Sequence, residues 1–288
     1  MERADRYFKA GDFDKAKVEY LNLLRIDHQS IIPVQQIGYI WLEQGVPLRA
    51  VPFLTRVREL APQNTTARTK LASAYMALGD FADARKEALA VLKQDPTRSD
   101  CLIIATDTAQ TKEEIAEAEQ WLDKFPNKNT AAFHLAAASL ATRKGEASSA
   151  AEQMQQALVA EPNSARAHLL TGYFYFVRSN PSHAESELKA AADLAPARSE
   201  EKIKYAEFKA ANGGVEEAKT ILTGITKAAP DYVPAWRDLA QIALTEKKYD
   251  EGLSSLENIL SRDADNPEAR LLQATFFMAK GDEAKAVA

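Results

Sequence analysis

Residues 65–96 read TTARTKLASAYMALGDFADARKEALAVLKQDP and contain two apolar patterns of helical period. In the first half, Leu71, Ala72 and Tyr75 follow the spacing i, i+1, i+4, which places them on one face of a helix. The second half contains a stripe at i, i+4 and i+7, formed by Ala84, Ala88 and Val91. Between the stripes stands Gly79, a residue type that commonly ends a helix. These residues predict two amphipathic helices joined by a tight turn.

The residues that bound this hairpin recur along the chain at one spacing. Asp80 follows the glycine as a candidate N-cap of the second helix, and Pro96 stops that helix. Prolines in the same place stand 34 residues apart, at Pro62 and Pro96 and again at Pro162, Pro196 and Pro230. The glycines at 11, 45 and 79 have the same spacing. The sequence therefore predicts a helical hairpin repeated every 34 residues.

Extended over the whole chain, this period predicts one array over residues 1–288 with eight to nine repeats. Seven complete repeats lie between a partial one at 1–30 and a partial one at 267–288, and they cover 31–64, 65–98, 99–130, 131–164, 165–198, 199–232 and 233–266. We predict an all-α fold in which neighbour interfaces supply the stability. The pattern runs to both ends, which predicts that the sequence is a piece of a longer protein.

The composition argues against several classes of protein. The 36 basic and 41 acidic residues give a net charge of −5, unlike a dedicated nucleic-acid binder. The apolar fraction of 46% and charged fraction of 27% are typical of folded domains. A single cysteine, Cys101, cannot form an internal disulfide, and we expect it to be a small buried apolar residue. No apolar run approaches the ~18 residues that span a bilayer, so this segment is not expected to insert into a membrane.

The repeat resembles that of the tetratricopeptide family in length and pattern. The second repeat fills the family's small and apolar positions with Val34, Ile37, Gly38, Trp41, Ala50, Leu54, Val57 and Pro62. The sixth fills them with His168, Thr171, Gly172, Tyr175, Ala184, Leu188, Ala191 and Pro196. The resemblance covers essentially the whole chain and implies a right-handed α-solenoid, a superhelix of antiparallel helix pairs. It also implies that Gly38 and Gly172 lie where the helices of a pair approach closely.

Two places depart from the family pattern. The fourth repeat has Thr111-Lys112-Glu113 in place of a turn glycine and is two residues short, so we expect the array to be least regular around residues 105–135. Pro52 falls within the second helix of the second repeat, and it lacks the N–H that a helix interior uses. We expect Pro52 to bend this helix or to delay its start.

Motifs for catalysis or cofactor binding are missing from the sequence. It contains no GxxxxGKS/T, HExxH, CxxC or GxSxG pattern, and it has four histidines. His134 and His168 stand 34 residues apart and occupy equivalent places in adjacent repeats. A metal site would need a third ligand and usually a fourth, so we expect both histidines to fill the aromatic slot between repeat helices. We predict no enzyme activity, no bound metal and no cofactor.

The resemblance implies one functional surface, the concave groove lined by the first helix of each repeat. Charged, polar and aromatic residues mix at the groove positions, which suits a peptide or helix of mixed character. The predicted partner-binding residues are Gln35, Gln36, Tyr39, Glu43, Thr69, Lys70, Ser73, Asp107, Arg143, Arg166, Tyr173, Phe176, Lys204, Glu207, Arg237 and Gln241. Chaperone-binding members of the family clamp a C-terminal carboxylate with groove asparagines. No asparagine of this chain stands at those positions, so carboxylate-clamp chaperone binding is not expected.

We expect binding to concentrate in the second and sixth repeats. Tyr39 and Tyr173 occupy the same groove position there, and Phe176 lies one helical turn beyond Tyr173. Exposed aromatic side chains are over-represented among residues that carry interface energy. Arg166 and Lys204 could pair with an acidic group of the ligand. In the alternative interpretation, Tyr173 and Phe176 pack against the next repeat and stabilise the fold instead.

These features predict a protein–protein interaction scaffold that binds a peptide or helical segment of a protein partner in its groove. Two alternatives stay open: an accessory array of a larger protein, and a structural element that self-associates through truncated ends. The alanine-rich repeats also resemble those of bacterial envelope tetratricopeptide proteins of exopolysaccharide or protein export. That resemblance implies a location in the bacterial cytoplasm, the periplasm or the cell envelope.

Overall fold

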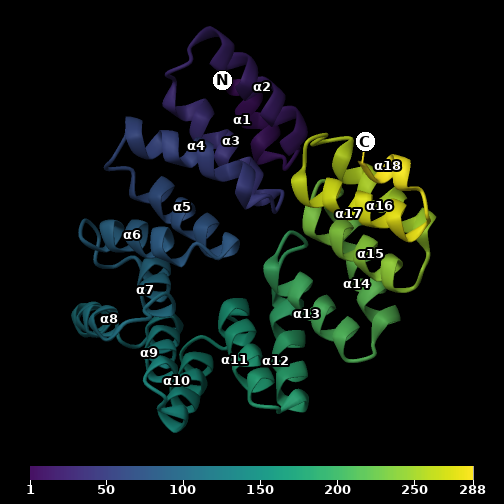
Figure 1. Ribbon diagram of the computed structural model, residues 1–288. Coiled ribbons are helices and arrows are strands. Elements are labelled where there is room, and N and C mark those ends of the chain that lie inside the picture. Colours follow the sequence, from purple (N-terminus) through teal and green to yellow (C-terminus); the bar gives the residue numbers. More distant parts are fainter. Residues whose placement is uncertain (288) are drawn as a thin grey trace. The chain divides into compact units, whose positions relative to one another are not determined.

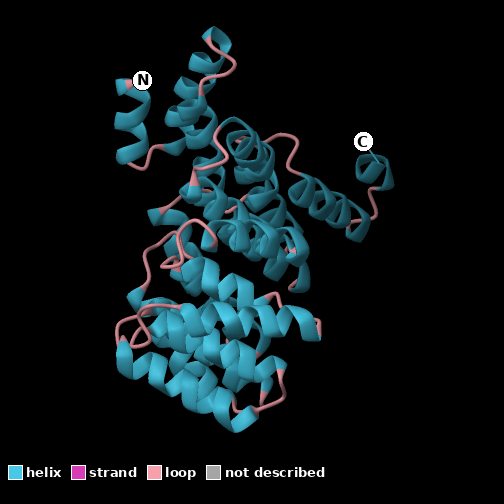
Figure 2. Ribbon diagram, turned by 90° about the vertical axis from the view of Figure 1, so that its left-hand side faces the viewer, coloured by secondary structure: helices cyan, strands magenta, loops and turns pink. Residues whose placement is uncertain are grey.

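The computed structural model describes residues 1–287, which form eighteen helices joined by short turns and contain no strand (Figure 1). Figure 2 shows the alternation of helices and connecting loops. The first helices of the successive hairpins are α1 (Glu2–Lys9), α3 (Ile31–Glu43), α5 (Thr65–Leu78), α7 (Ser99–Asp107), α9 (Ala131–Arg143), α11 (Ala165–Val177), α13 (Glu200–Ala211), α15 (Val233–Thr245) and α17 (Pro267–Ala279). The second helices are α2 (Phe13–Ile26), α4 (Pro47–Leu60), α6 (Phe81–Leu92), α8 (Lys112–Lys124), α10 (Ala147–Ala160), α12 (Pro181–Leu194), α14 (Val215–Ala228), α16 (Tyr249–Leu260) and α18 (Glu283–Val287). The predicted all-α fold is confirmed.

Short polar side chains and glycines set the helix ends. The Asp80 carboxylate accepts a hydrogen bond from the backbone N–H of Asp83 at 3.4 Å, so its predicted role as N-cap of α6 is confirmed. Asn64 caps α5 in the same way, because its side-chain oxygen accepts from the N–H of Ala67 at 3.0 Å. The turn glycines have left-handed backbone, with φ from +72° to +86°, which only glycine adopts at little cost. Each hairpin turn is therefore determined by a few local residues.

The helices group into two compact units. The N-terminal unit comprises Met1–Leu42 and Val46–Leu194, and the C-terminal unit comprises Glu43–Gly45 and the chain from Ala195 onward. In the N-terminal unit, α9 packs against α7, α8, α10 and α11. In the C-terminal unit, α15 packs against α13, α14, α16 and α17. Within each unit, such a helix contacts the helices before and after it along the chain, which is the packing of an α-solenoid.

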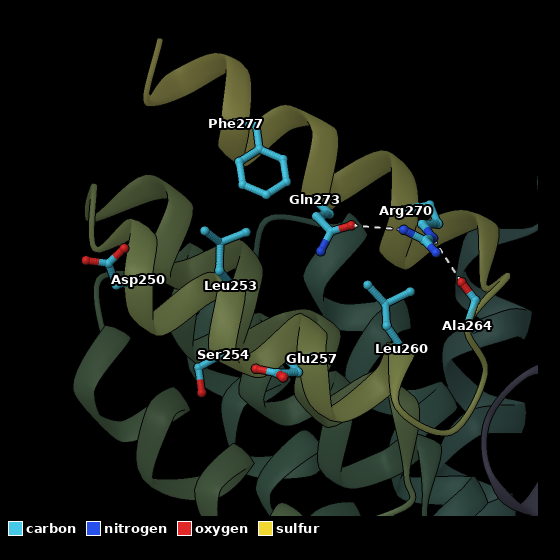
Figure 3. A pocket seen from close by; sticks show the side chains of 9 residues that line it. All are labelled: Asp250, Leu253, Ser254, Glu257, Leu260, Ala264, Arg270, Gln273 and Phe277. Carbon is cyan, nitrogen blue, oxygen red and sulfur yellow. Dashed lines mark hydrogen bonds between the residues drawn. The ribbon is translucent and has the colours of Figure 1, made fainter. Parts of the chain in front are cut away.

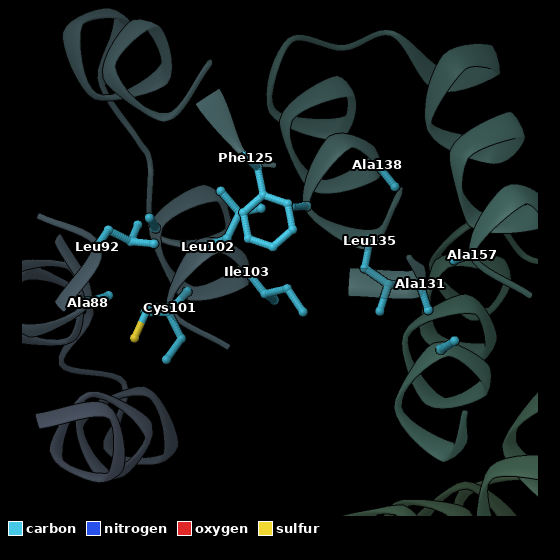
Figure 4. Close-up of a cluster of buried hydrophobic side chains, with 14 of the residues drawn as sticks. Ala88, Leu92, Cys101, Leu102, Ile103, Phe125, Ala131, Leu135, Ala138 and Ala157 are labelled. Atoms are coloured by element: carbon cyan, nitrogen blue, oxygen red, sulfur yellow. The ribbon is translucent and has the colours of Figure 1, made fainter. Parts of the chain in front are cut away.

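A large cluster of buried apolar side chains runs from α5 to α11 in the N-terminal unit (Figure 4). In Figure 4, Phe125, which follows α8 directly, points toward Leu102 and Ile103 of α7. Cys101 is fully buried, as expected, with its Sγ 3.4 Å from the hydroxyl oxygen of Thr69. Burial raises the pKa of this thiol. The thiolate, which is the reactive form, is therefore disfavoured and Cys101 acts as a packing residue.

The fourth repeat contains a short first helix. α7 has nine residues, whereas α5 has 14 and α9 has 13. A capping box takes over the role of the missing turn glycine: the N–H of Glu114 donates to the Thr111 hydroxyl at 3.2 Å, and the N–H of Thr111 donates to the Glu114 carboxylate at 3.0 Å. The buried Arg85 of α6 donates to the carbonyl oxygens of Ala105 and Glu114. Arg85 thereby ties α6 to the end of α7 and the start of α8.

Pro52 lies inside α4, which begins at Pro47. The expectation that Pro52 delays the start of this helix is therefore wrong. Pro47 stands at the first helical position, where its fixed φ suits the helix and its missing N–H would have no intrahelical partner. The helix has already begun when the chain reaches Pro52.

Candidate functional site

One pocket in the N-terminal unit gathers three of the predicted groove residues. Asp107 ends α7, Arg143 ends α9, and Tyr173 lies in α11. The pocket has a volume of about 530 Å³, within the range of roughly 300–1,000 Å³ found for ligand sites. Its other lining residues come from α9, α10, α11 and the turn after α11, and they are Leu135, Ser139, Thr142, Met154, Leu170, Phe174, Val177 and Arg178.

The lining combines a buried apolar part with an open edge. Leu135, Met154 and Phe174 are each less than 8% exposed, and they belong to the apolar cluster of the N-terminal unit. Val177, in contrast, is 79% exposed at the end of α11. An apolar side chain that enters the pocket would contact this lining and be removed from water. The removal of apolar surface from water is the dominant favourable contribution to the free energy of most protein association.

Asp107 contributes a carboxyl group whose pKa is raised. Burial raises the pKa of Asp107, against the smaller lowering effects of the Ser139 hydrogen bond and the positive charges of Arg166 and Arg143. The Arg143 guanidinium donates a hydrogen bond to the backbone carbonyl oxygen of Asp107. A cation is favoured at this place because the last carbonyl groups of α7 carry partial negative charge.

A second guanidinium comes from Arg178, the residue that follows α11. Its Cζ lies 3.7 Å from the centroid of the Phe174 ring, a geometry in which a cation is attracted to the ring face. The Arg178 side chain is exposed. Within residues 1–287, neither Arg143 nor Arg178 forms an ion pair with a carboxylate. The edge of the pocket therefore presents two positive groups.

The remaining predicted residues of α11 lie outside the pocket lining. Phe176 is 44% exposed. Arg166 lies in the first turn of α11 and acts on Asp107 through its charge. Tyr173 and Phe176, which the sequence pattern grouped together, are thus separated by the structure: Tyr173 lines the pocket and Phe176 does not.

Other predicted residues lie on α3 and α5, the first helices of two other hairpins. The Gln35 side-chain oxygen accepts from Asn64 at 2.7 Å. The hydroxyl groups of Thr69 and Ser73 each donate to a backbone carbonyl oxygen one turn earlier in α5, at 2.9 and 3.1 Å. Lys70 is exposed on α5, and Glu43 is the last residue of α3. Internal hydrogen bonds therefore already use much of this polar face.

Gln36 and Tyr39 differ from their neighbours on α3. The Gln36 Oε1 atom and the Tyr39 hydroxyl are buried, and neither has a hydrogen-bond partner among the described residues. Burial raises the pKa of Tyr39, so its hydroxyl stays protonated. These two atoms form a buried polar spot on α3, apart from the pocket.

In the C-terminal unit, the predicted residues bind one another. Lys204 Nζ lies 2.9 Å from the Glu207 carboxylate on α13. On α15, the Arg237 guanidinium lies 3.0 Å from Asp238 and 3.8 Å from Glu207, and Glu268 of α17 is 3.7 Å away. Burial raises the pKa of Asp238, while Arg237 lowers it. The remaining predicted residue is exposed on α15, and it is Gln241.

The two histidines at equivalent repeat positions bond to the following helix. His134 Nδ1 lies 2.8 Å from the Gln153 side-chain oxygen, and His168 Nδ1 lies 2.6 Å from the Glu187 carboxylate. His168 Nε2 also lies 2.9 Å from the Pro162 carbonyl oxygen. Over residues 1–287, no group of three or more His, Cys, Asp and Glu side chains is arranged to hold a metal ion.

Two further cavities lie between other helices. One of about 490 Å³ lies between α16 and α17, where Phe277 and Gln273 face Leu253 and Leu260 (Figure 3). Its Arg270 donates to the Ala264 carbonyl oxygen at 2.9 Å. The other, of about 420 Å³, lies between α8, α9 and α10, and its only Lys or Arg lining residue, Lys144, pairs with acidic residues at 3.1 and 3.2 Å, which are Glu119 and Glu146.

Sequence reasoning missed most of the apolar lining of the α7–α9–α11 pocket. Leu170 and Val177 stand at i−3 and i+4 from Tyr173, so helical spacing around that tyrosine would have found them. Phe174 stands at i+1, which this spacing does not select. Met154 carries no comparable signal, because it reaches the pocket from the second helix of its repeat.

The comparisons with known proteins place this fold in a family. A model of the family described as tetratricopeptide repeat protein 21 second ARM domain matches residues 43–281. The chain belongs to this tetratricopeptide repeat family. No curated protein sequence matches it. The likeness to envelope export proteins stays a prediction.

Solved tetratricopeptide structures resemble this chain at low sequence identity. A tetratricopeptide repeat protein from Parabacteroides merdae matches with a TM-score of 0.54 and 16% identity, over 81% of this chain and 96% of that chain. A thermophilic tetratricopeptide repeat protein of Thermus thermophilus matches with a TM-score of 0.46 and 19% identity, over 75% of this chain and 100% of that chain. The first of these similarities shows the fold.

The tetratricopeptide repeat fold is that of protein-interaction scaffolds, and repeat proteins of this type generally act through binding instead of catalysis. Among the described residues, no helix has the length and apolar character needed to cross a bilayer. The pocket between α7, α9 and α11 is the candidate binding site of this repeat protein.

Proposed function

We propose that this tetratricopeptide repeat protein is an interaction scaffold whose first helices bind a peptide or helical segment of a partner protein. The pocket between α7, α9 and α11 carries the proposal, because the first helices of three hairpins converge on one apolar cavity with polar groups at its edge. Interfaces concentrate their binding energy where an apolar anchor fills such a pocket and polar contacts surround it.

A selection of random peptides against the purified chain, followed by affinity measurement, tests this function. Val177→Asp places a charge at the exposed edge of the pocket, and Val159→Asp is its matched control. Val159 is also exposed, at 72%, near the end of α10, and it does not line the pocket. We expect Val177→Asp to weaken binding of the selected peptides about tenfold or more. Val159→Asp should leave their affinity unchanged.

The melting temperatures of both valine variants separate binding from folding. Because both side chains are exposed, we expect both variants to melt close to the wild-type temperature. Equal binding by all three proteins would mean that the peptides bind elsewhere, and the proposed site would be wrong.

The two groove aromatics of α11 make a second comparison at the same site. Tyr173 lines the pocket and Phe176 does not, so we expect Tyr173→Ala to weaken peptide binding more than Phe176→Ala. A lower melting temperature with unchanged affinity in Tyr173→Ala would mean that this ring serves packing only. Light scattering at several concentrations tests the alternative of self-association, which predicts a mass that rises with concentration.

A further inference from the structure

The charge at the edge of the α7–α9–α11 pocket is opposite to that of the chain as a whole. The chain has a net charge of −5. The pocket is nevertheless lined by two arginines, Arg143 and Arg178, and by one acidic residue, Asp107. Burial raises the pKa of Asp107, and even when this carboxyl group is charged the two arginines outnumber it. The local balance is therefore positive.

Two other cavities have the opposite balance of charge. The cavity between α8, α9 and α10 is lined by three carboxylates and by Lys144. The cavity between α16 and α17 is lined by Asp250 and Glu257 and by one arginine, Arg270. Each of those cavities has more acidic than basic lining residues.

Two other arginines of the N-terminal unit are neutralised by one carboxylate. Glu87, only 1% exposed, accepts from Arg58 at 2.8 Å and from Arg68 at 2.6 Å. Arg143 and Arg178 form no such pair among the described residues. Arg143 is held by a carbonyl oxygen and Arg178 by a ring face. A guanidinium has five N–H donors, so each retains donors for a ligand oxygen.

We propose that this pocket takes an apolar side chain of a partner segment that carries a glutamate or aspartate beside it, with that carboxylate bound by Arg143 and Arg178. This inference rests on the proposed function and adds the chemistry of the ligand. Hydrogen bonds between guanidinium and carboxylate are about twice as strong as neutral ones. The apolar lining binds the anchor, and the charged edge selects for the acidic neighbour.

Short end-blocked peptides with a central Leu-Phe pair test the proposal by fluorescence anisotropy. Three versions flank this pair with glutamates, glutamines or lysines. We expect the wild-type chain to bind the glutamate peptide about tenfold more tightly than the glutamine peptide, and the lysine peptide most weakly. Added salt should reduce the glutamate preference, because these charges lie at a solvent-exposed edge.

Two pairs of substitutions assign the preference to the pocket. The double variant Arg143→Gln with Arg178→Gln should bind the glutamate and glutamine peptides within about twofold of each other. Arg6→Gln with Arg25→Gln removes the same number of charges from exposed sites on α1 and α2, and should retain the wild-type preference. Asp107→Asn removes the one acidic lining residue and should tighten binding of the glutamate peptide more than that of the glutamine peptide.

Each outcome separates the ligand chemistry from the proposed function. If the three peptides bind equally and Val177→Asp weakens all of them, the pocket binds peptides and the acidic preference is wrong. A lysine preference, or a glutamate preference that survives loss of both pocket arginines, also overturns it. Failure of every peptide to bind, in selection and in titration, overturns the ligand chemistry and the proposed function together.

Discussion

The hairpin turns depend on single residues with left-handed backbone. Gly79 has φ +76°, and the atoms around it would leave a Cβ more than 4 Å of free space, so its conformation alone requires glycine. Two left-handed turns have a residue other than glycine at this place: Ser179 has φ +57° and Lys247 has φ +61°. A non-glycine residue pays about 1–2 kcal/mol for this conformation. These two turns are therefore strained positions in an otherwise favourable pattern.

Lys247→Gly should stabilise the protein. Relief of the left-handed strain exceeds the extra backbone entropy that glycine loses on folding, so we expect the free energy of unfolding to rise by about 0.5–1 kcal/mol. Urea unfolding followed by circular dichroism measures the change. Gly79→Ala is the reverse experiment and should lower the free energy of unfolding by about 1 kcal/mol. A neutral result in both variants would show that these turns relax away from the left-handed conformation.

At the scale of the helix pair, two glycines set how closely the partners pack. A Cβ on Gly38 of α3 would lie 2.8 Å from Leu54 Cδ2 of α4, and a Cβ on Gly172 of α11 would lie 2.7 Å from Leu188 Cγ of α12. Both distances are shorter than side-chain contacts allow. The prediction that these glycines mark the close approach of paired helices is confirmed.

Substitution of glycine by alanine should therefore have opposite effects on the free energy of unfolding at Gly172 and at Gly224. Gly172→Ala should lower the free energy of unfolding by about 1–3 kcal/mol, because the new methyl group overpacks the contact with Leu188. Gly224 lies inside α14, and a Cβ there would meet no atom within 4 Å. Gly224→Ala should raise the free energy of unfolding by about 0.5–1 kcal/mol through helix propensity alone. Equal destabilisation by both changes would contradict the packing argument, and urea unfolding of both variants decides it.

At the scale of the whole molecule, each helix is stabilised by its contacts with adjacent helices. The buried carboxylate of Glu87 shows the principle, since it joins α6 to Arg58 of α4 and Arg68 of α5. Such a carboxylate is tolerated in the interior because both guanidinium groups pair with it. Loss of this carboxylate should therefore lower the local stability of the adjoining helices and leave that of distant helices unchanged.

Glu87→Gln tests this local character by hydrogen exchange. Loss of the buried charge leaves two arginines without their partner, and we expect a cost of about 2–3 kcal/mol, limited by the access of both guanidinium groups to water. Backbone amides of α4–α7 should exchange faster, while those of α9–α12 keep the wild-type rates. Glu59→Gln, which removes one partner of the exposed pair with Arg56, should change no helix measurably. Faster exchange throughout the N-terminal unit would instead indicate one cooperative core.

The fold could be predicted from the sequence because each repeat is determined by interactions between residues within one hairpin. The caps at Asn64 and Asp80, the turn glycines and the close-approach glycines act over a few residues or between the paired helices of one hairpin. Spacing alone reveals such features. Pro52 is the exception, because the favourable helix start at Pro47 outweighs the hydrogen bond lost further on.

The candidate site was much harder to predict from the sequence than the fold, because it depends on tertiary structure. The family resemblance placed Asp107, Arg143 and Tyr173 at groove positions, but only the packing of α7, α9 and α11 brings them to one pocket with Met154. The sequence also proposed Lys204 and Arg237 as ligand contacts, and only the folded chain shows that each pairs with a carboxylate. Helix formation follows from local hydrogen bonds and apolar period, and the sequence carries both. Which side chains converge depends on how separate helices pack, and that is decided by contacts between residues far apart in the chain.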